Sequence, residues 1–137
     1  LSDFVFYKNY RGHTVKTVVL EDIGTDVKKI AEFFKAEYKE NKYKYALIVG
    51  TDTLFPNQTI STSGSPKTPS DYLYFVMDSN DMIPDVHYGR IVASTPEEVK
   101  RQTEKFQDYQ ERRNDVSGLL HMIGIASNEG SNPSDND

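Results

Sequence analysis

The sequence has 137 residues, of which 36% are hydrophobic and 27% are charged, a balance typical of a folded globular protein rather than a disordered one. Its 16 basic and 21 acidic residues give a net charge of −5, which argues against a nucleic-acid-binding protein, because such proteins neutralise phosphates with lysine and arginine. No hydrophobic run approaches the ~20 residues that span a membrane, and the lack of cysteine excludes disulfides, thiolate metal sites and a cysteine nucleophile within this sequence.

The two ends of the sequence suggest a piece of a longer polypeptide. It starts at Leu1 with neither an initiator methionine nor a signal peptide, and residues 127–137 are polar, Gly or Pro throughout. We therefore expect residues 127–137 to be either a frayed tail or part of a longer loop.

The first forty residues predict two helices with a strand between them. A helix is expected over residues 1–10, ending at the Arg11-Gly12 pair, because glycine readily takes the left-handed conformation that ends helices. Residues 15–20 are rich in β-branched side chains and predict a strand. Residues 26–41 predict the clearest helix, since their hydrophobic side chains recur at helical spacing.

The middle of the sequence predicts the strands of a parallel sheet. Residues 45–49 form an unbroken hydrophobic run that ends at Gly50, which is typical of a strand buried on both faces, and the strand–helix–strand order predicts a right-handed crossover. Residues 57–70 predict a long loop, and residues 72–77 and 86–93 predict two strands joined by a short acidic connection.

The last third predicts one helix and one strand. Thr95 and Glu98 fit a capping box with Pro96 in the first turn, so a helix is expected from there to about Arg113, with Val99, Phe106 and Tyr109 facing inward. Residues 119–126 predict a final strand. Alternating strands and helices make this an α/β protein with a mainly parallel sheet and flanking helices.

Two acidic residues follow predicted strands, at the edge where parallel sheets bind ligands. Asp52 follows the strand over residues 45–49, and Glu129 lies three residues beyond Ala126. A lone glutamate in such a place is more often a solvated loop residue than a functional one.

The connection over residues 78–85 is the strongest candidate for a metal site. Asp78, Asp81 and Asp85, with the amide of Asn80, concentrate oxygen ligands that a calcium ion would bind and whose like charges it would offset. An EF-hand does not fit, because its glycine and its twelfth-position glutamate are missing. The same residue types also form simple hairpin turns, so both interpretations stay open.

Other familiar chemistry is missing from the sequence. No phosphate-binding glycine loop or dinucleotide fingerprint is present, and His13, His87 and His121 are too scattered for a metal pair. His121, in a hydrophobic run, is most simply a core residue.

Short motifs along nearly the whole sequence resemble the gingipains, a family of secreted cysteine endopeptidases. They include Ser70-Asp71-Tyr72 and Gly89-Arg90, and they occur in the family's order over residues 3–12, 15–23, 45–50, 70–74, 88–91, 94–98, 109–112 and 124–130. The resemblance implies that residues 1–118 form the first α/β subdomain, without its opening strand. Residues 119–137 would then be the first strand and following loop of a second, caspase-like subdomain.

The resemblance also assigns roles to the acidic residues. It implies that Glu129 accepts a hydrogen bond from the catalytic histidine, and that histidine, in a His-Gly motif, and the nucleophilic cysteine both lie downstream. It further implies a structural calcium ion held by Asp78, Asp81, Asp85 and the Ile83 carbonyl. Asp52 is a further candidate ligand, although in the family an Asp directly follows the glycine, where this sequence has Thr51, and a one-residue difference in spacing leaves Asn80 as an alternative to Asp81.

The expected partners are the rest of the same catalytic domain and protein or peptide substrates, with a secreted or cell-surface location and no activity for this chain alone. The resemblance implies that the pocket that selects substrates is built from segments downstream of this sequence. The alternative is a non-catalytic α/β module that binds calcium or a partner. A receiver-like signalling domain ranks last, because the acidic pair expected after an early strand is missing.

Overall fold

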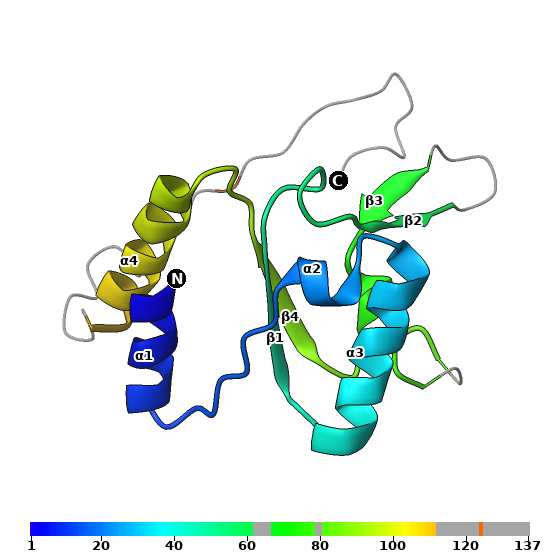
Figure 1. Cartoon of the computed structure of the whole chain (residues 1–137), viewed down its shortest axis with the longest axis horizontal. Coiled ribbons are helices and arrows are strands. Elements are labelled where there is room, and N and C mark those ends of the chain that lie inside the picture. The colour runs from blue at the N-terminus through cyan, green and yellow to red at the C-terminus, as the bar shows by residue number, and fades with distance from the viewer. Residues whose placement is uncertain (62–66, 79–80, 112–123, 125–137) are drawn as a thin grey trace. The chain divides into compact units, whose positions relative to one another are not determined.

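The structure is a computed structural model that describes residues 1–61, 67–78, 81–111 and 124. The chain divides into two compact units, Leu1–Gln107 and Asp108–Asp137, and nearly all described residues belong to the first. The elements, labelled in Figure 1, are α1 (Ser2–Tyr10), α2 (Leu20–Ile23), α3 (Val27–Asn41), β1 (Tyr45–Val49), β2 (Gln58–Ile60), β3 (Thr68–Ser70), the 3-10 helix η1 (Tyr72–Tyr74), β4 (His87–Ile91) and α4 (Pro96–Glu111).

The two predicted N-terminal helices are confirmed. Helix α1 ends before Gly12, which has a φ of 90°. Helix α3 begins after Asp26, whose side chain accepts hydrogen bonds from the amides of Lys28 and Lys29, and it ends at Lys42 in the left-handed conformation. Its hydrophobic face places Ile30 in the core with no exposed surface.

Strands β1 and β4 form a parallel pair with helices on either side, which confirms the α/β class (Figure 1). Their register pairs Tyr45 with His87 and Val49 with Ile91. The expected burial of β1 on both faces is wrong for the described structure, since Ile48 is 2% exposed whereas Tyr45 and Leu47 are 65% and 45% exposed. The covered face of β1 carries Ile48, which lies in the core cluster with Ile30 of α3 and Tyr74 of η1.

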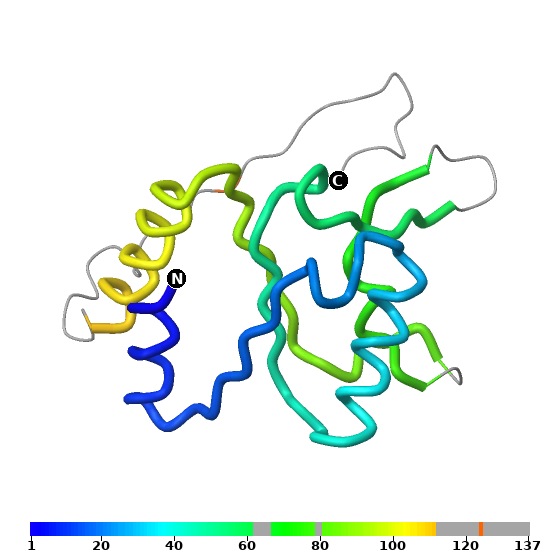
Figure 2. Tube along the Cα trace, in the orientation of Figure 1, coloured from blue at the N-terminus to red at the C-terminus, as the bar shows by residue number. Residues whose placement is uncertain are grey.

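The predicted strand over residues 15–20 is not formed. Residues 15–19 have no regular structure, and α2 begins at Leu20 (Figure 2). β-Branched residues favour a strand only where a neighbouring strand offers a ladder of hydrogen bonds, and in the described residues β1 pairs with β4 alone. The predicted crossover is therefore replaced by a parallel pair whose connection carries β2, β3 and η1.

Two expectations for that connection are also wrong. Residues 57–70 contain the antiparallel strands β2 and β3 rather than an irregular loop. Residues 72–77 form η1 and an irregular segment rather than a strand, because Tyr74 and Phe75 turn into the core beside Ile30 and Ile48. Tyr74 and Phe75 are fully buried.

Helix α4 starts where the sequence predicts, with one change in its cap. The amide of Glu98 donates to the Thr95 hydroxyl, but the Glu98 carboxylate accepts from the amide of Ser94 instead of closing the box on Thr95. Phe106 and Tyr109 were expected to face inward and are instead 42% and 67% exposed.

Helix α4 also contacts α1. The Phe106 ring lies 6.5 Å from the ring of Phe4, and the buried residue of α4 is Thr103.

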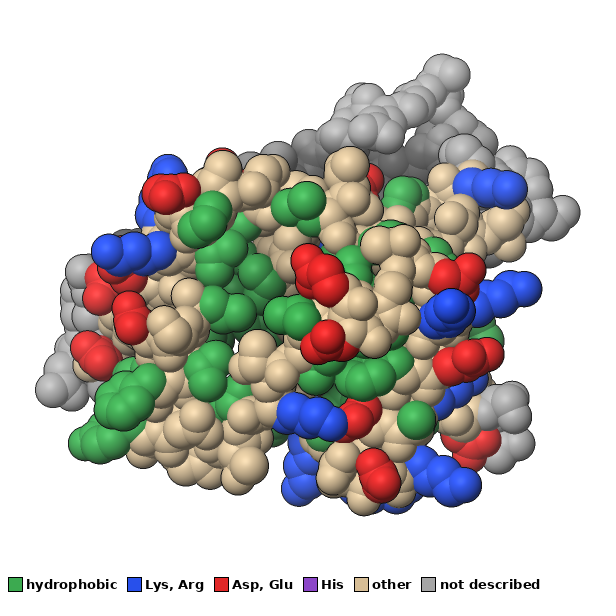
Figure 3. Space-filling model, viewed as in Figure 1, with side chains coloured by type: hydrophobic (Ala, Val, Ile, Leu, Met, Phe, Trp, Pro, Cys, Tyr) green, Lys and Arg blue, Asp and Glu red, His purple; other side chains and the backbone are tan. Residues whose placement is uncertain are grey.

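Hydrophobic side chains are open to solvent on the face shown in Figure 3. Among the described helices, none is long and hydrophobic enough to cross a membrane. Apart from Gly124, the predicted strand over residues 119–126 lies outside the described residues, as do the helix end near Arg113 and His121.

Candidate functional site

The carboxyl ends of β1 and β4 lie at one edge of the parallel pair, where α/β proteins bind ligands. Beyond β1 the chain turns sharply at Gly50, whose φ is 132° and whose amide donates to the Ile91 carbonyl at 2.9 Å. A Cβ atom at position 50 would lie 3.3 Å from the Cβ of Leu54. The positive φ therefore favours glycine at position 50, and a Cβ atom there would also crowd Leu54.

Arg90 of β4 holds the segment that follows β1. Its Nε and NH2 groups donate to the two carboxylate oxygens of Asp71 at 2.7 and 2.6 Å. Its NH1 group donates to three carbonyl oxygens, those of Gly50, Thr51 and Phe55, at 2.9, 3.2 and 3.1 Å. Because the Arg90 and Asp71 side chains are only 12% and 14% exposed, this clamp joins β4, the β1 end and the start of η1 in a largely dry environment.

A buried tyrosine fixes the same segment one residue further on. The Tyr74 hydroxyl donates to the Pro56 carbonyl at 2.8 Å. Burial, with a smaller effect of the Asp71 charge, raises the pKa of Tyr74 to about 12, so the hydroxyl keeps its proton and stays a donor at neutral pH. The segment from Gly50 to Pro56 is thus held by side chains of β4 and η1.

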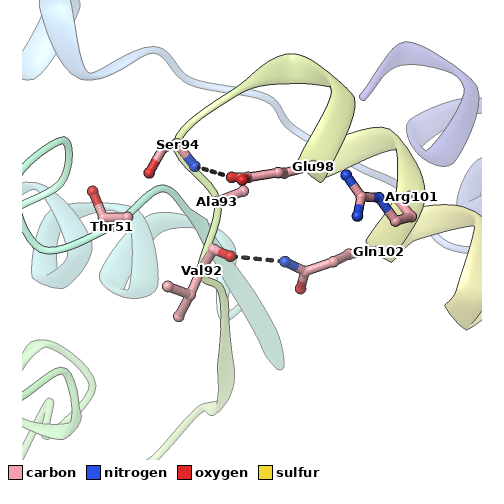
Figure 4. Close-up of a pocket in the computed structure, with 7 residues that line it drawn as sticks. All are labelled: Thr51, Val92, Ala93, Ser94, Glu98, Arg101 and Gln102. Atoms are coloured by element: carbon pink, nitrogen blue, oxygen red, sulfur yellow. Dashed lines mark hydrogen bonds between the residues drawn. The ribbon is translucent and has the colours of Figure 1, made fainter.

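A hollow of about 390 Å³ opens beside this segment (Figure 4). Its walls come from the β1 end, the segment after β4 and the first turns of α4, and include Thr51, Val92, Ser94, Glu98, Arg101 and Gln102. The Gln102 amide donates to the Val92 carbonyl at 2.7 Å, and the Glu98 carboxylate accepts from the Ser94 amide at 2.7 Å. These bonds fix the wall formed by α4.

The predicted calcium ligands do not form a preassembled metal site. Asp85 Oδ2 accepts hydrogen bonds from the amides of Met77 and Asp78, and Asp81 Oδ1 accepts from the amide of Ile83. Over the described ranges, no three side chains of His, Cys, Asp or Glu come close enough together to share a metal ion. The carboxylates that the structure describes here therefore act as caps for a turn.

The remaining predicted site residues lie apart from this connection. Asp52 is exposed in the turn after β1, where its Oδ1 accepts from the Thr53 hydroxyl at 3.4 Å. Glu129, the predicted catalytic carboxylate, lies outside the described residues, as does Asn80. Among the described residues, the side chain of Asp52 does not join those of Asp78, Asp81 and Asp85 in any group of three that could hold a metal ion.

The Arg90–Asp71 clamp was missed by the reasoning from sequence. Both residues belong to motifs noted above, but neither was given a role. The signal in the sequence was an arginine within the predicted strand over residues 86–93, since a buried arginine needs a carboxylate partner.

Comparisons with known proteins give a consistent picture. The family model described as peptidase family C25 matches residues 1–137. Gingipain R2 of Porphyromonas gingivalis is 31% identical over 141 residues, an alignment that covers 99% of this chain and 18% of the relative. Gingipain R1 of the same organism is also 31% identical over 99% of this chain, and 14% of that relative is covered.

Two solved structures resemble the fold. One is the crystal structure of the Arg-specific cysteine proteinase gingipain R, with a TM-score of 0.69 and 32% identity over 78% of this chain and 24% of that chain. The other is the complex of Porphyromonas gingivalis RgpB pro- and mature domains, with the same TM-score and identity, covering 78% of this chain and 25% of that chain. The chain therefore spans less than a fifth of these curated relatives and about a quarter of each solved chain.

Proposed function

This chain belongs to peptidase family C25, and from that premise we propose that it forms one part of a gingipain-like cysteine endopeptidase domain. The observation that supports the proposal is the family match over residues 1–137, together with 32% identity and a TM-score of 0.69 to a cysteine proteinase. Because the sequence contains no cysteine, the nucleophile must be supplied by residues outside these 137.

The catalytic contribution that we propose for this chain is the carboxylate of Glu129. A carboxylate that accepts a hydrogen bond from the catalytic imidazole fixes its orientation and stabilises the imidazolium that forms during the reaction. No histidine in the sequence is followed by glycine, so the catalytic histidine of the His-Gly motif would also come from outside the chain.

The test is a Glu129→Gln substitution in the complete polypeptide that carries this chain. Glutamine preserves the shape of the side chain but removes the charge, so turnover of a peptide substrate should fall on the order of 100-fold with the fold intact. Glu40→Gln, an exposed change on α3, is the matched control and should leave turnover unchanged. Wild-type turnover in the Glu129 variant would refute the assignment.

A structural calcium ion in the acidic connection is a second part of the proposal. It is supported by the density of oxygen groups in Asp78, Asp81, Asp85 and the Ile83 carbonyl, with Asp52 as a further candidate. Since the described carboxylates cap backbone amides, binding would require them to regroup, and no catalytic step is assigned to the ion.

Calorimetric titration of the complete polypeptide with calcium tests this site. The Asp78→Ala/Asp81→Ala double variant should bind calcium more weakly, whereas Asp22→Ala, an exposed change in α2, should not. An unchanged affinity in the double variant would remove these two ligands from the proposal.

We also propose that residues 1–118 belong to a first subdomain whose sheet is completed by a further strand, and that residues 119–137 begin a caspase-like second subdomain. The open side of β1 supports the first point. In the part of the chain that the structure describes, β1 has a ladder partner only in β4, so its other edge carries no ladder hydrogen bonds to a strand. A strand between β1 and residues 15–19 would give those residues the ladder that the sequence predicts for them.

The proposed location is secreted or cell-surface, and the proposed substrates are proteins or peptides. The solved complex of pro- and mature domains in a relative supports an association with other parts of the same polypeptide. Hydrolysis of a denatured protein by the complete polypeptide, and no hydrolysis by this chain alone, are the expected results.

A further inference from the structure

Helix α1 carries aromatic side chains on two opposite sides. Phe4 is 8% exposed and its ring lies against that of Phe106 of α4, whereas Phe6, ~200° further around the helix axis, is 74% exposed. Tyr10 is 81% exposed and follows Phe6 by four residues, so the two side chains share one face of the helix. Figure 3 shows hydrophobic side chains gathered at the lower left, over the second half of α1.

A helix of this kind is normally covered on both sides. Surface helices place hydrophobic residues toward the core and polar residues toward solvent, and α3 does so, since its large hydrophobic side chains are all buried or half-buried. Helix α1 departs from that pattern because Phe6 and Tyr10 occupy its solvent side. Adjacent exposed aromatic side chains of this kind mark an interaction surface.

Charged residues flank this surface at its two ends. Asp3 lies in the first turn of α1, and Arg11 ends the helix, with its amide donating to the Tyr7 carbonyl at 3.0 Å. Their separation of eight residues places them ~12 Å apart along the axis and ~80° apart around it, on the same flank. Both side chains are exposed. We call Asp3, Phe6, Tyr10 and Arg11 the outer face of α1.

The outer face is complementary to a second copy of itself. When two such helices pack antiparallel about a two-fold axis, Phe6 of each copy lies beside Tyr10 of the other. The same arrangement brings Asp3 of each copy beside Arg11 of the other, because the two charges lie at opposite ends of one flank. Opposite charges therefore meet twice across the interface, and like charges are kept apart.

We propose that the outer face of α1 is a self-association surface that binds the outer face of a second copy in antiparallel orientation. This inference goes beyond the proposed peptidase function and does not rest on it. The four aromatic rings would remove roughly 500–800 Å² from water, so with the flanking side chains the interface stays near the lower limit for specific association. The dimer should therefore be weak and reversible, forming at protein concentrations on the order of 10–100 μM.

Sedimentation velocity of the complete polypeptide, with its nucleophile alkylated to prevent cleavage, tests the surface over a wide range of concentration. The wild type should show a reversible equilibrium between monomer and dimer. The Phe6→Ser/Tyr10→Ser double variant should raise the dissociation constant at least about tenfold, because aromatic side chains supply most of the binding energy at such interfaces. Leu54→Ser is the matched control, since Leu54 is 54% exposed but lies in the turn after β1, and it should leave the constant unchanged.

A charge exchange tests the antiparallel arrangement. Asp3→Arg alone and Arg11→Asp alone should each weaken self-association, because like charges would then face each other across the two-fold axis. An equimolar mixture of the two variants should form a mixed dimer about as tightly as the wild type associates with itself, since opposite charges meet again at both ends. Circular dichroism of each variant checks that α1 and the rest of the fold are retained.

Three results would overturn the proposal. The first is a wild type that stays monomeric at every concentration, which is the result expected if another part of the polypeptide covers α1. The second is self-association that the double serine change leaves as tight as in the wild type, and the third is a mixture of the two charge variants that fails to associate. Peptide cleavage is assayed separately, so a polypeptide that dimerises through α1 but cleaves nothing would refute the proposed function alone.

Discussion

Replacing Asp71 by asparagine tests the clamp that organises the carboxyl edge of the sheet. Asparagine has nearly the same shape, but it offers one acceptor oxygen in place of two and turns an NH2 group toward one guanidinium donor of Arg90. The variant therefore loses one charged hydrogen bond, which contributes ~1.5–3 kcal/mol, and leaves a largely buried donor unsatisfied, which costs ~1–3 kcal/mol.

The structure limits how much the Asp71→Asn change should lower the free energy of unfolding. Arg90 keeps its three carbonyl partners, and the side chains of the pair are 12% and 14% exposed, so water relieves only part of the loss. We expect the free energy of unfolding to fall by about 2–3 kcal/mol, less than the ~3–5 kcal/mol typical of breaking a fully buried pair.

Urea and thermal unfolding of the complete polypeptide, followed by circular dichroism, measure the effect. The matched control is Glu104→Gln, which breaks the exposed Lys100–Glu104 pair on α4, where the side chains are 70% and 58% exposed and the N–O distance is 3.8 Å. That change should cost about 0.5 kcal/mol or less. If Asp71→Asn proved as stable as Glu104→Gln, the clamp would not stabilise the fold and the reasoning would be refuted.

Three further substitutions probe the elements around this edge. Gly50→Ala should lower the free energy of unfolding by about 1–3 kcal/mol because Gly50 has a positive φ. Gly89→Ala is its control and should be nearly neutral, because a Cβ atom at position 89 meets nothing within 4 Å. Equal effects of the two changes in chemical denaturation would contradict the prediction. Tyr74→Phe should cost ~1 kcal/mol by leaving the Pro56 carbonyl unpaired. Because the pKa of Tyr74 is raised to about 12, its contribution is complete below the ordinary value of 10.0 and is lost as the pH rises through 12, so ultraviolet titration of the native protein should show one phenol that ionises late. Hydrogen bonds from two backbone amides lower the pKa of Asp26 below 3.8. The stabilisation by its carboxylate is therefore present above pH 3.8 and disappears as the pH falls through the folded pKa. The Asp26→Ala variant should lose this acid dependence, and an unchanged pH profile of the free energy of unfolding would contradict the prediction.

The elements that could be predicted from the sequence are those whose causes are local. Helix α3 has a capping aspartate and a hydrophobic face within its own residues, and β1 has a continuous hydrophobic run. The predicted strand over residues 15–20 failed because a strand needs a neighbour that the local sequence does not reveal. The strand predicted over residues 72–77 failed because Tyr74 and Phe75 fill a core built by α3 and β1, residues distant in the chain.

The candidate site followed the same rule. That ligands gather beyond β1 and β4 could be expected from the parallel sheet, and the structure places the hollow there. An arginine in a predicted strand indicated that Arg90 needs a carboxylate partner, but the local sequence does not identify Asp71, because the two lie 19 residues apart and the carbonyl acceptors come from a third segment. The roles of Glu129 and of the calcium ligands stay predictions, since Glu129 lies outside the described residues and the described carboxylates of Asp85 and Asp81 accept hydrogen bonds from backbone amides.

The parallel pairing of Tyr45 with His87 also sets an order of events during synthesis. At ~5–20 residues per second, a ribosome needs ~2–8 s to make the ~40 residues that separate the two strands. During that interval the hydrophobic segment Tyr45–Val49 lacks its partner strand. Charged residues that flank such a segment discourage aggregation, and Lys42 and Lys44 lie directly before it. Replacing both lysines by uncharged residues should therefore lower the yield of soluble protein during synthesis. The free energy of unfolding of the folded protein should change little.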